Sequence, residues 1–316
     1  MTRAKAQPTG AVPEDLGREP DRTGNILGLS KSGFHEIAYV EWGPADTDDV
    51  VICVHGLTRQ GRDFDYLASA LAARGRRVVC PDLAGRGRSA WLRDPADYTV
   101  LQYCADMNAL IARTGARTVD WVGTSLGGLI GIVLAGLPDS PIRRLVINDI
   151  GPVVPTNALH RIGRYVADMP ETFDTFDDAE QYLREVLAPF GNVADEHWRH
   201  LTQYSVRWDP EQDRYLTLCD PAILQALRAP ANPGAHLWAY WDAIGHPILV
   251  VRGRESDFLP SYLSNEMARR NRNAIVHDVP GCGHAPTLMP RDQIEAVVGF
   301  LMPERNTRPS GPTPQP

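Results

Sequence analysis

The chain contains no long hydrophobic run. No apolar stretch among its 316 residues approaches the roughly 20 residues needed to span a bilayer. Residues 1–20 are polar and contain proline and glycine, without the apolar segment of a secretory signal. We therefore expect no transmembrane segment, no membrane partner and no export by that route.

Basic residues are fewer than acidic ones. The 32 lysines and arginines are outnumbered by 39 aspartates and glutamates, which gives a net charge of −7 and a pI of about 5.7. A chain of this charge has no generally basic surface to meet nucleic acid or anionic lipid. We expect neither as a partner.

Cysteine is scarce and lacks the spacing of a disulfide framework. Five cysteines, an odd number, indicate a reducing compartment, and we expect a cytoplasmic location. Cys53 and Cys80 lie within β-type runs and are expected to be buried thiols. Cys282 stands two residues before His284, but no base-and-carboxylate pattern surrounds it, so a packed side chain is expected there too.

Signatures of cofactor binding are missing as well. The glycine-rich turn at residues 81–89 has neither the Lys-Ser/Thr ending of a phosphate loop nor a G-x-G-x-x-G pattern. Asp82 and Ser89 are expected to hydrogen-bond backbone within this turn. Three histidines, His236, His246 and His277, lack ligand spacing with cysteines or carboxylates. We expect no cofactor and no metal.

What the chain does contain is an alternation of β-type and helical runs. Unbroken Val/Ile/Leu runs separated by helices are typical of a parallel sheet covered on both faces. The expected strands are at residues 37–42, 49–54, 76–80, 118–122, 144–150, 247–251 and 274–279. The expected helices are at residues 63–74, 100–113, 263–270 and 293–301, with a further one after Ser125.

The alternation breaks between residues 151 and 245. This stretch is helical in character and dense in aromatic residues. We expect it to form a helical cap over the carboxyl ends of the strands, where open α/β sheets bind ligands. The α/β core would then comprise residues 25–150 and 246–303, with flexible tails at residues 1–24 and 304–316.

Ser125 is the most informative single residue. It lies in Gly-Thr-Ser-Leu-Gly at residues 123–127, directly between a β-type run and a helical run. A serine at a sharp strand-to-helix turn needs small neighbours, and the turn exposes its hydroxyl. The backbone N–H groups that follow lie at a helix N-terminus, where they can stabilise an oxyanion. Ser125 is therefore a candidate nucleophile.

A serine hydroxyl needs an adjacent base that is itself oriented by a carboxylate. His284, in a glycine-rich loop after a strand, is the candidate base. Asp257 is the preferred carboxylate, because it follows the turn at Gly253 at a distance that lets it reach the histidine loop. Asp149, which ends the strand before the insertion, and Glu255, in the same loop as Asp257, remain open as alternatives.

Two backbone N–H groups are expected to form an oxyanion hole. One belongs to Leu126, the residue after the serine, and the other to Leu57, in the loop after the first long strand. Gly56 lets the backbone turn close to the substrate oxygen. His55 is expected to brace this loop by hydrogen bonding.

These motifs together resemble the α/β-hydrolase fold superfamily over residues 37–301. The resemblance rests on His55-Gly56, Asp82-x-x-Gly-x-Gly-x-Ser89, the Ser125 turn, Gly253-x-x-x-Asp257 and Gly283-His284. Residues 55–64 are similar to a bacterial carboxylesterase-like branch. The resemblance implies an eight-stranded, mostly parallel sheet with a helical cap after the sixth strand, and a cofactor-free Ser-Asp-His hydrolase.

The serine itself narrows the reaction. Attack on an sp³ carbon would leave a serine ether that water does not readily cleave, whereas acyl transfer proceeds through a tetrahedral intermediate. We expect hydrolysis of small-molecule carboxylic esters: small esters, lactones or short polyester oligomers. One alternative is a C–C bond hydrolase of dione or ring-fission acids, which would use Arg59, Arg161 or Arg164 to bind a carboxylate. Another is a ligand-binding receptor on a hydrolase fold.

Overall fold

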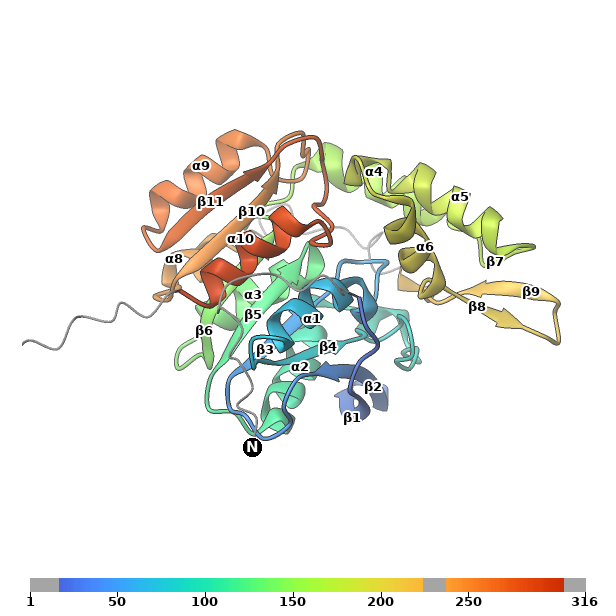
Figure 1. The fold of residues 1–316 in the computed structure, drawn as a ribbon, viewed down its shortest axis with the longest axis horizontal. Helices are drawn as coiled ribbons and strands as arrows, with labels where there is room; N and C mark the ends of the chain where they lie inside the picture. Colours follow the sequence, from blue (N-terminus) through green and yellow to red (C-terminus); the bar gives the residue numbers. More distant parts are fainter. Residues whose placement is uncertain (1–16, 224–236, 304–316) are drawn as a thin grey trace, which may run out of the picture.

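An eight-stranded sheet runs through the computed structural model, which describes residues 17–223 and 237–303 (Figure 1). The strand order is β1-β2-β4-β3-β5-β6-β10-β11; β1 and β2 run antiparallel to their neighbours and the others are parallel. The expected mostly parallel, eight-stranded sheet is confirmed. Its strands are β1 (Arg22–Ser30), β2 (Gly33–Trp42), β3 (Val50–Val54), β4 (Arg77–Pro81), β5 (Val119–Thr124), β6 (Ile142–Asn148), β10 (Ile248–Gly253) and β11 (Ala274–Val279).

The first strand was not predicted, and residues 22–24 belong to it rather than to a tail. Its buried positions hold the small residues Gly28 and Ser30, whereas Leu27 and Leu29 are 63% and 59% exposed. Leu27 and Leu29 therefore lie on the uncovered face of β1, and only Ile26 among its apolar residues packs against the core, so the positions of the leucines do not indicate which face is buried. Residues 1–16 and 304–316, expected as tails, lie outside the described residues.

Helices cover both faces of the sheet, and side chains alternate between two cores. Val50 and Ile52 of β3 face one core, whereas Val51 and Cys53 face the other. The first core is covered by α2 (Val100–Thr114), α3 (Leu126–Gly136), α8 (Trp238–Ala243) and α9 (Ser261–Arg270). The second is covered by α1 (Asp65–Ala72), which follows the short helix η1 (Gly61–Phe64), and by α10 (Arg291–Leu301).

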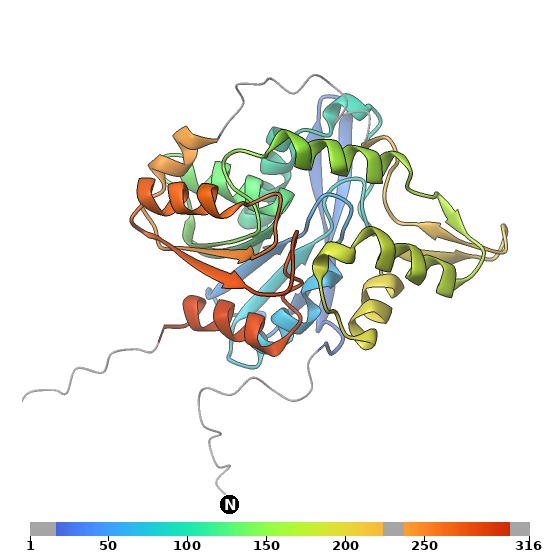
Figure 2. The same ribbon diagram turned by 90° about the horizontal axis from the view of Figure 1, so that it is seen from above.

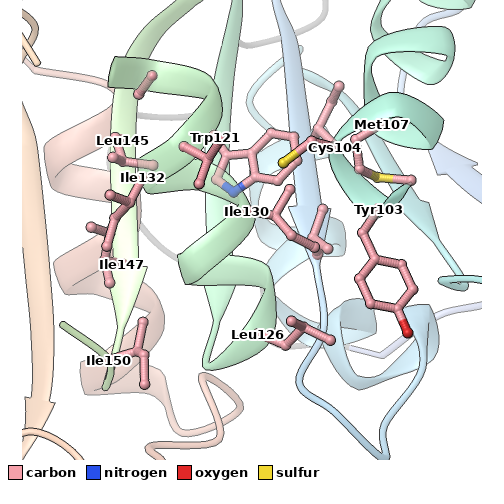
Figure 3. Packing of buried hydrophobic residues seen from close by; sticks show 14 of the residues in the cluster. Tyr103, Cys104, Met107, Trp121, Leu126, Ile130, Ile132, Leu145, Ile147 and Ile150 are labelled. Carbon is pink, nitrogen blue, oxygen red and sulfur yellow. The ribbon is translucent and has the colours of Figure 1, made fainter. Parts of the chain in front are cut away.

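Helix α3 packs closely against the centre of the sheet. The fully buried Trp121 of β5 donates a hydrogen bond from Nε1 to the Gly127 carbonyl at 3.0 Å. A Cβ at Gly131 would lie 2.6 Å from that same indole nitrogen, so the helix approaches β5 only because glycine occupies this position. Figure 3 shows side chains of β5, β6 and α3 packed together in this core.

Buried ion pairs hold the first residues of β5 in place. The fully buried carboxylate of Asp120 accepts hydrogen bonds from Arg76 Nη2 at 2.6 Å and from Arg143 Nη2 at 2.8 Å. Asp49 pairs with both arginines, at 3.1 and 2.7 Å. A buried carboxylate is tolerated when it is paired and hydrogen-bonded in this way. Strand β5 is thus anchored at the end opposite Ser125.

The insertion follows β6, the sixth strand, as expected. It comprises α4 (Thr156–Ala167), β7 (Thr172–Phe173), α5 (Phe176–Val186), η3 (Ala188–Phe190), α6 (Asp195–Gln203), β8 (Val206–Asp209) and β9 (Arg214–Thr217). Strands β7, β9 and β8 form a small antiparallel sheet that the sequence pattern did not indicate. Residues 224–236 of the expected cap lie outside the described residues.

Helix α8 falls within the expected cap but packs on the core. A Cβ at Gly136 of α3 would lie 2.4 Å from the carbonyl oxygen of Tyr240, and Trp241 is fully buried in the first core. The remaining insertion forms the cap in Figures 1 and 2; in Figure 2 the yellow-green helices α5 and α6 and the gold strands β8 and β9 lie together at one side.

The cap contacts loops that follow the strands. Arg59, after β3, donates from Nη1 to Ser205 Oγ at 2.8 Å. The Gly87 N–H, after β4, donates to the Leu218 carbonyl at 2.9 Å, and the N–H of Gly283, after β11, donates to a cap carbonyl at 2.7 Å. These loops all leave the carboxyl ends of their strands, so the cap covers the expected edge of the sheet. Within residues 17–223 and 237–303, no helix has both the length and the apolar content of a membrane span.

Candidate active site

Ser125 occupies the turn between β5 and α3 in a conformation that is rare for a residue with a side chain, with φ 51° and ψ −111°. Its N–H donates to the carbonyl of Asn148 on β6 at 2.9 Å. A Cβ at Gly127 would lie 2.0 Å from the Val54 carbonyl oxygen, and one at Gly123 would lie 2.2 Å from the Gly127 oxygen. The two glycines of the motif are therefore required by close backbone approach.

The structure brings the candidate nucleophile and base together. His284 Nε2 lies 2.8 Å from Ser125 Oγ, and His284 Nδ1 lies 2.8 Å from Asp149 Oδ2. Because a carboxylate can only accept, Nδ1 carries the proton toward Asp149, and Nε2 is left to accept from the serine hydroxyl. Asp149 is fully buried and Ser125 is 9% exposed.

The expectation that Asp257 orients His284 is wrong. The Asp257 carboxylate accepts two bonds from Arg161 on cap helix α4, from Nε and from Nη2, both at 2.8 Å. This guanidinium holds the pKa of Asp257 below its ordinary value. The other alternative, Glu255, is exposed and accepts from the Gly281 N–H at 3.3 Å. The carboxylate at the histidine is that of Asp149.

Strand order explains the position of Asp149. Strand β6 pairs directly with β5, so Asn148 lies opposite Thr124 and Asp149 lies just beyond the strand end, beside the serine turn. Its carboxylate also accepts from the Gly253 N–H at 2.8 Å and from Ser256 Oγ at 2.5 Å. These bonds come from the last residue of β10 and from the loop that follows it, and they hold the carboxylate at the histidine.

Two further residues support the histidine loop and were missed at the sequence level. The Phe258 ring stacks on the His284 ring with centroids 3.9 Å apart and an angle of 19°. Asn148 donates from Nδ2 to the Pro286 carbonyl at 2.7 Å and to Thr124 Oγ1 at 3.0 Å. A lone amide directly after the apolar residues 145–147 was the available signal for Asn148.

The loop after β3 lies against the serine turn. The Gly127 N–H donates to the His55 carbonyl at 3.1 Å, and a Cβ at Gly56 would lie 3.6 Å from Ser125 Cβ. Leu126 is the first residue of α3, so its N–H has no partner inside the helix. Leu57 follows Gly56 on the neighbouring loop. Its part in an oxyanion hole, like that of Leu126, stays a prediction.

His55 braces this loop, as expected. Its Nδ1–H donates to the Gly56 carbonyl at 2.7 Å, and its Nε2 accepts from the Leu83 N–H at 2.8 Å. Burial, and after it the charge of Arg86, lowers the pKa of His55 to about 3. The imidazole is therefore neutral, and its two nitrogens have fixed donor and acceptor roles.

The lowered pKa of His55, about 3 in the folded protein, predicts a loss of stability in mild acid. At pH 5 the unfolded chain binds a proton on this histidine and the folded chain does not. The free energy of unfolding therefore decreases as the pH falls below about 6.5, the ordinary pKa of histidine. From pH 7.5 to pH 5 this linkage lowers the free energy of unfolding by about 2 kcal/mol. Urea unfolding of the wild type and His55→Asn at both pH values measures it; equal pH dependence of the two proteins contradicts it.

The turn at residues 81–89 and Cys282 have the structural roles expected of them. Asp82 accepts from the Gly61 N–H at 2.7 Å and the Arg88 N–H at 3.0 Å, and Ser89 Oγ donates to the Asp82 carbonyl at 2.5 Å. Burial raises the pKa of the Cys282 thiol to about 12, so it is a neutral packed side chain.

Two of the arginines considered for binding a substrate carboxylate already hold carboxylates of the protein. Arg59 donates to both oxygens of Asp63 at 2.8 Å, and Arg161 is paired with Asp257. Arg164 is exposed on α4. Within residues 17–223 and 237–303 no group of three or more His, Cys, Asp or Glu side chains is arranged to hold a metal; His236 lies outside these ranges.

Two cavities lie where the cap meets the core. The first has about 410 Å³ of empty space, its opening to solvent included, with both hydroxyl groups and apolar side chains in its wall. Its lining includes Thr58, Ser205, Thr217, Met169, Phe173, Leu183 and Val206. A second cavity, of about 350 Å³, borders the serine turn and the histidine loop through Gly56, Thr124 and Pro286.

A sheet of this order, with a serine on the β5–α3 turn bonded to a histidine and a buried aspartate, defines a class of hydrolase. Residues 49–288 match the family model for the α/β hydrolase fold, and the chain belongs to this family.

Two proteins with similar sequences are named as a hydrolase and a lipase. The chain is 44% identical over 293 residues to the 3-hydroxybutyrate-oligomer hydrolase of Cupriavidus necator, covering 89% of this chain and 97% of that protein. It is 34% identical over 263 residues to an sn-1-specific diacylglycerol lipase of Mus musculus, covering 79% and 80%. An α/β hydrolase structure from Novosphingobium aromaticivorans matches with a TM-score of 0.77 and 32% identity over 88% of this chain and 98% of that one. The protein is an ester hydrolase of this family.

Proposed function

We propose that the protein hydrolyses its ester substrates through an acyl-enzyme on Ser125. The observation that carries this is the pair of 2.8 Å contacts that link Ser125, His284 and Asp149. His284 Nε2 removes the hydroxyl proton as Ser125 Oγ attacks the ester carbonyl carbon. Asp149 stabilises the imidazolium that forms and holds its Nδ1–H.

The tetrahedral intermediate then collapses. Its oxyanion accepts hydrogen bonds from the N–H groups of Leu126 and Leu57. His284 returns the proton to the leaving alkoxide, and the alcohol departs. A water molecule, deprotonated by His284, attacks the acyl-enzyme; the carboxylic acid is released and the serine hydroxyl is restored.

For the substrate we propose short oligomers of hydroxyalkanoic acids. The 44% identical relative is named as a hydrolase of 3-hydroxybutyrate oligomers, and the alignment covers almost all of both chains. A polyester alternates polar ester groups with apolar methyl groups, and the wall of the first cavity likewise combines polar with apolar side chains. Its apolar part is formed by Met169, Phe173 and Val206 among others, and the hydroxyls of Ser205 and Thr217 in the same wall donate to the carbonyls of Leu201 and Pro170.

A substrate panel tests this assignment. The purified protein is given 3-hydroxybutyrate dimer and trimer, p-nitrophenyl butyrate, p-nitrophenyl palmitate and a vinylogous dione, with the Ser125→Ala variant as background. We expect kcat/KM to be highest for the oligomers, with 3-hydroxybutyrate released, and lowest for palmitate and the dione. Faster cleavage of palmitate points to a lipase, and dione cleavage without ester cleavage overturns the ester assignment.

A further inference from the structure

Arg86 is a fully buried guanidinium next to the loop that carries Leu57. Its Nε–H donates to the Leu57 carbonyl at 2.7 Å, and Nη1 donates to the Ala84 carbonyl at 2.7 Å and to Tyr103 Oη at 2.5 Å. In the part of the chain that the structure describes, no carboxylate forms an ion pair with it, and its buried Nη2 has no hydrogen-bond partner.

A buried cation that forms no ion pair lowers the stability of a folded protein, because its lost hydration is not replaced by an ion pair. The contrast is Arg76, also buried, which pairs with Asp120 at 2.6 Å and with Asp49 at 3.1 Å. Around Arg86 stand the aromatic rings of Tyr98 and Tyr103, whose centroids lie 5.9 and 5.0 Å from the guanidinium carbon. Cation–π contacts offset part of the desolvation cost.

The bonds to the loop fix both peptide groups of Leu57. The peptide that carries the Leu57 N–H has the Gly56 carbonyl at its other end, and that carbonyl accepts from His55 at 2.7 Å. The next peptide begins with the Leu57 carbonyl, which accepts from Arg86. The direction of the Leu57 N–H is thus set from both sides, and a preorganised oxyanion donor requires such support.

The turn that carries Arg86 is also bonded to the cap. The Gly87 N–H donates to the Leu218 carbonyl at 2.9 Å, and the Asp220 N–H donates to the Gly85 carbonyl at 2.8 Å. Asp220 accepts from the Tyr98 hydroxyl at 2.5 Å but makes no ion pair with Arg86. Arg86 therefore lies between residues 218–220, which follow β9 of the cap, and the loop after β3.

We propose that Arg86 is a positioning residue of the oxyanion site: it fixes Leu57 and places a buried positive charge beside the point where the substrate oxyanion forms. This role rests on the proposed acyl-enzyme mechanism. A guanidinium that forms no ion pair in the resting protein gains a negatively charged neighbour when the tetrahedral intermediate appears. The contribution is specific to the transition state and acts on kcat rather than on substrate binding.

Arg86→Gln and Arg86→Lys test the proposal. Glutamine keeps a hydrogen-bond donor without charge, and lysine keeps the charge without the planar fork. For Arg86→Gln we expect kcat per titrated active site to fall by about tenfold to a hundredfold, with KM changed less than threefold. For Arg86→Lys we expect a kcat between those of the wild type and Arg86→Gln. Active sites are counted by stoichiometric labelling with a fluorophosphonate. Arg76→Gln and Arg76→Lys are the matched controls: they lower Tm but leave kcat per labelled site unchanged.

A boronic acid that forms an anionic tetrahedral adduct with the serine supplies a second readout. Its Ki should rise in the Arg86 variants by the factor by which kcat falls, and stay constant in the Arg76 variants. Unchanged kcat per site and Ki in either folded Arg86 variant overturn the proposal, as does a kcat loss of the same size in the Arg76 variants. Failure of the wild type to bind the boronic acid and the fluorophosphonate refutes the acyl-enzyme mechanism instead.

Discussion

Replacement of Ser125 by alanine is expected to lower kcat/KM for a short ester by about four to six orders of magnitude. The variant lacks the oxygen that attacks the carbonyl, and His284, 2.8 Å away in the wild type, loses the group that it activates. Initial rates with p-nitrophenyl butyrate at enzyme concentrations high enough to detect residual turnover measure the effect.

Cys282→Ala is the matched control for this substitution. Its thiol is buried two residues from the histidine and has its pKa raised to about 12, so this variant should keep its activity and its labelling by a fluorophosphonate. Ser125→Ala should lose both. Ester turnover that persists in Ser125→Ala, or a label mapped to another residue, contradicts the assignment of the nucleophile.

Asp149→Asn is expected to lower kcat by about three to four orders of magnitude, whereas Asp257→Asn changes it by a few-fold at most. An asparagine amide at position 149 donates toward the histidine, so the ring adopts the tautomer in which Nε2 carries the proton and cannot accept from Ser125. Asp257 lies against Arg161, with about a third of each side chain exposed, and its loss removes only an exposed ion pair.

Steady-state kinetics of the two asparagine variants, with Tm measured alongside, separate these roles. The geometry of the Gly253 and Ser256 bonds to Asp149 predicts some loss of Tm in Asp149→Asn in addition to the loss of kcat. A large loss of kcat in Asp257→Asn combined with near-normal turnover in Asp149→Asn reverses the assignment of the carboxylate.

The positions of Ser125 and His284 could be predicted because their signals are local. A glycine-flanked serine between a β-type run and a helical run indicates a sharp strand-to-helix turn, because the close backbone approaches in such a turn require glycine at these positions. The loop that carries His284 follows the last strand directly. Both residues lie at the carboxyl edge of the sheet whatever the order of its strands.

The carboxylate could not be predicted in the same way, because it depends on which strands are neighbours. Asp149 and Asp257 both follow strands that precede His284 in the chain. Only the pairing of β6 with β5 places Asp149 beside Ser125, and the pairing of β10 with β6 places Asp257 farther along the sheet. Sheet order is a tertiary property and leaves no mark on the spacing of single residues.

Two other parts of the fold escaped the sequence pattern for physical reasons. Strand β1 exposes Leu27 and Leu29 and buries small residues, which inverts the usual relation between apolar side chains and burial. The cap sheet begins with β7, which has only two residues, too few for a period-two pattern to be recognised. Both elements depend on pairing with a neighbouring strand more than on their own composition.

The ion pairs of Asp120 also favour the native register of β5. Side chains alternate along β5, so a slip of one residue would turn Asp120 into an apolar core and away from Arg76 and Arg143. A misaligned sheet would then contain a buried, unpaired carboxylate, one of the costliest defects that a fold can contain. The same slip would also move Ser125 off the strand tip. The ion pairs of Asp120 therefore stabilise the register of β5 that also places Ser125 at the strand tip.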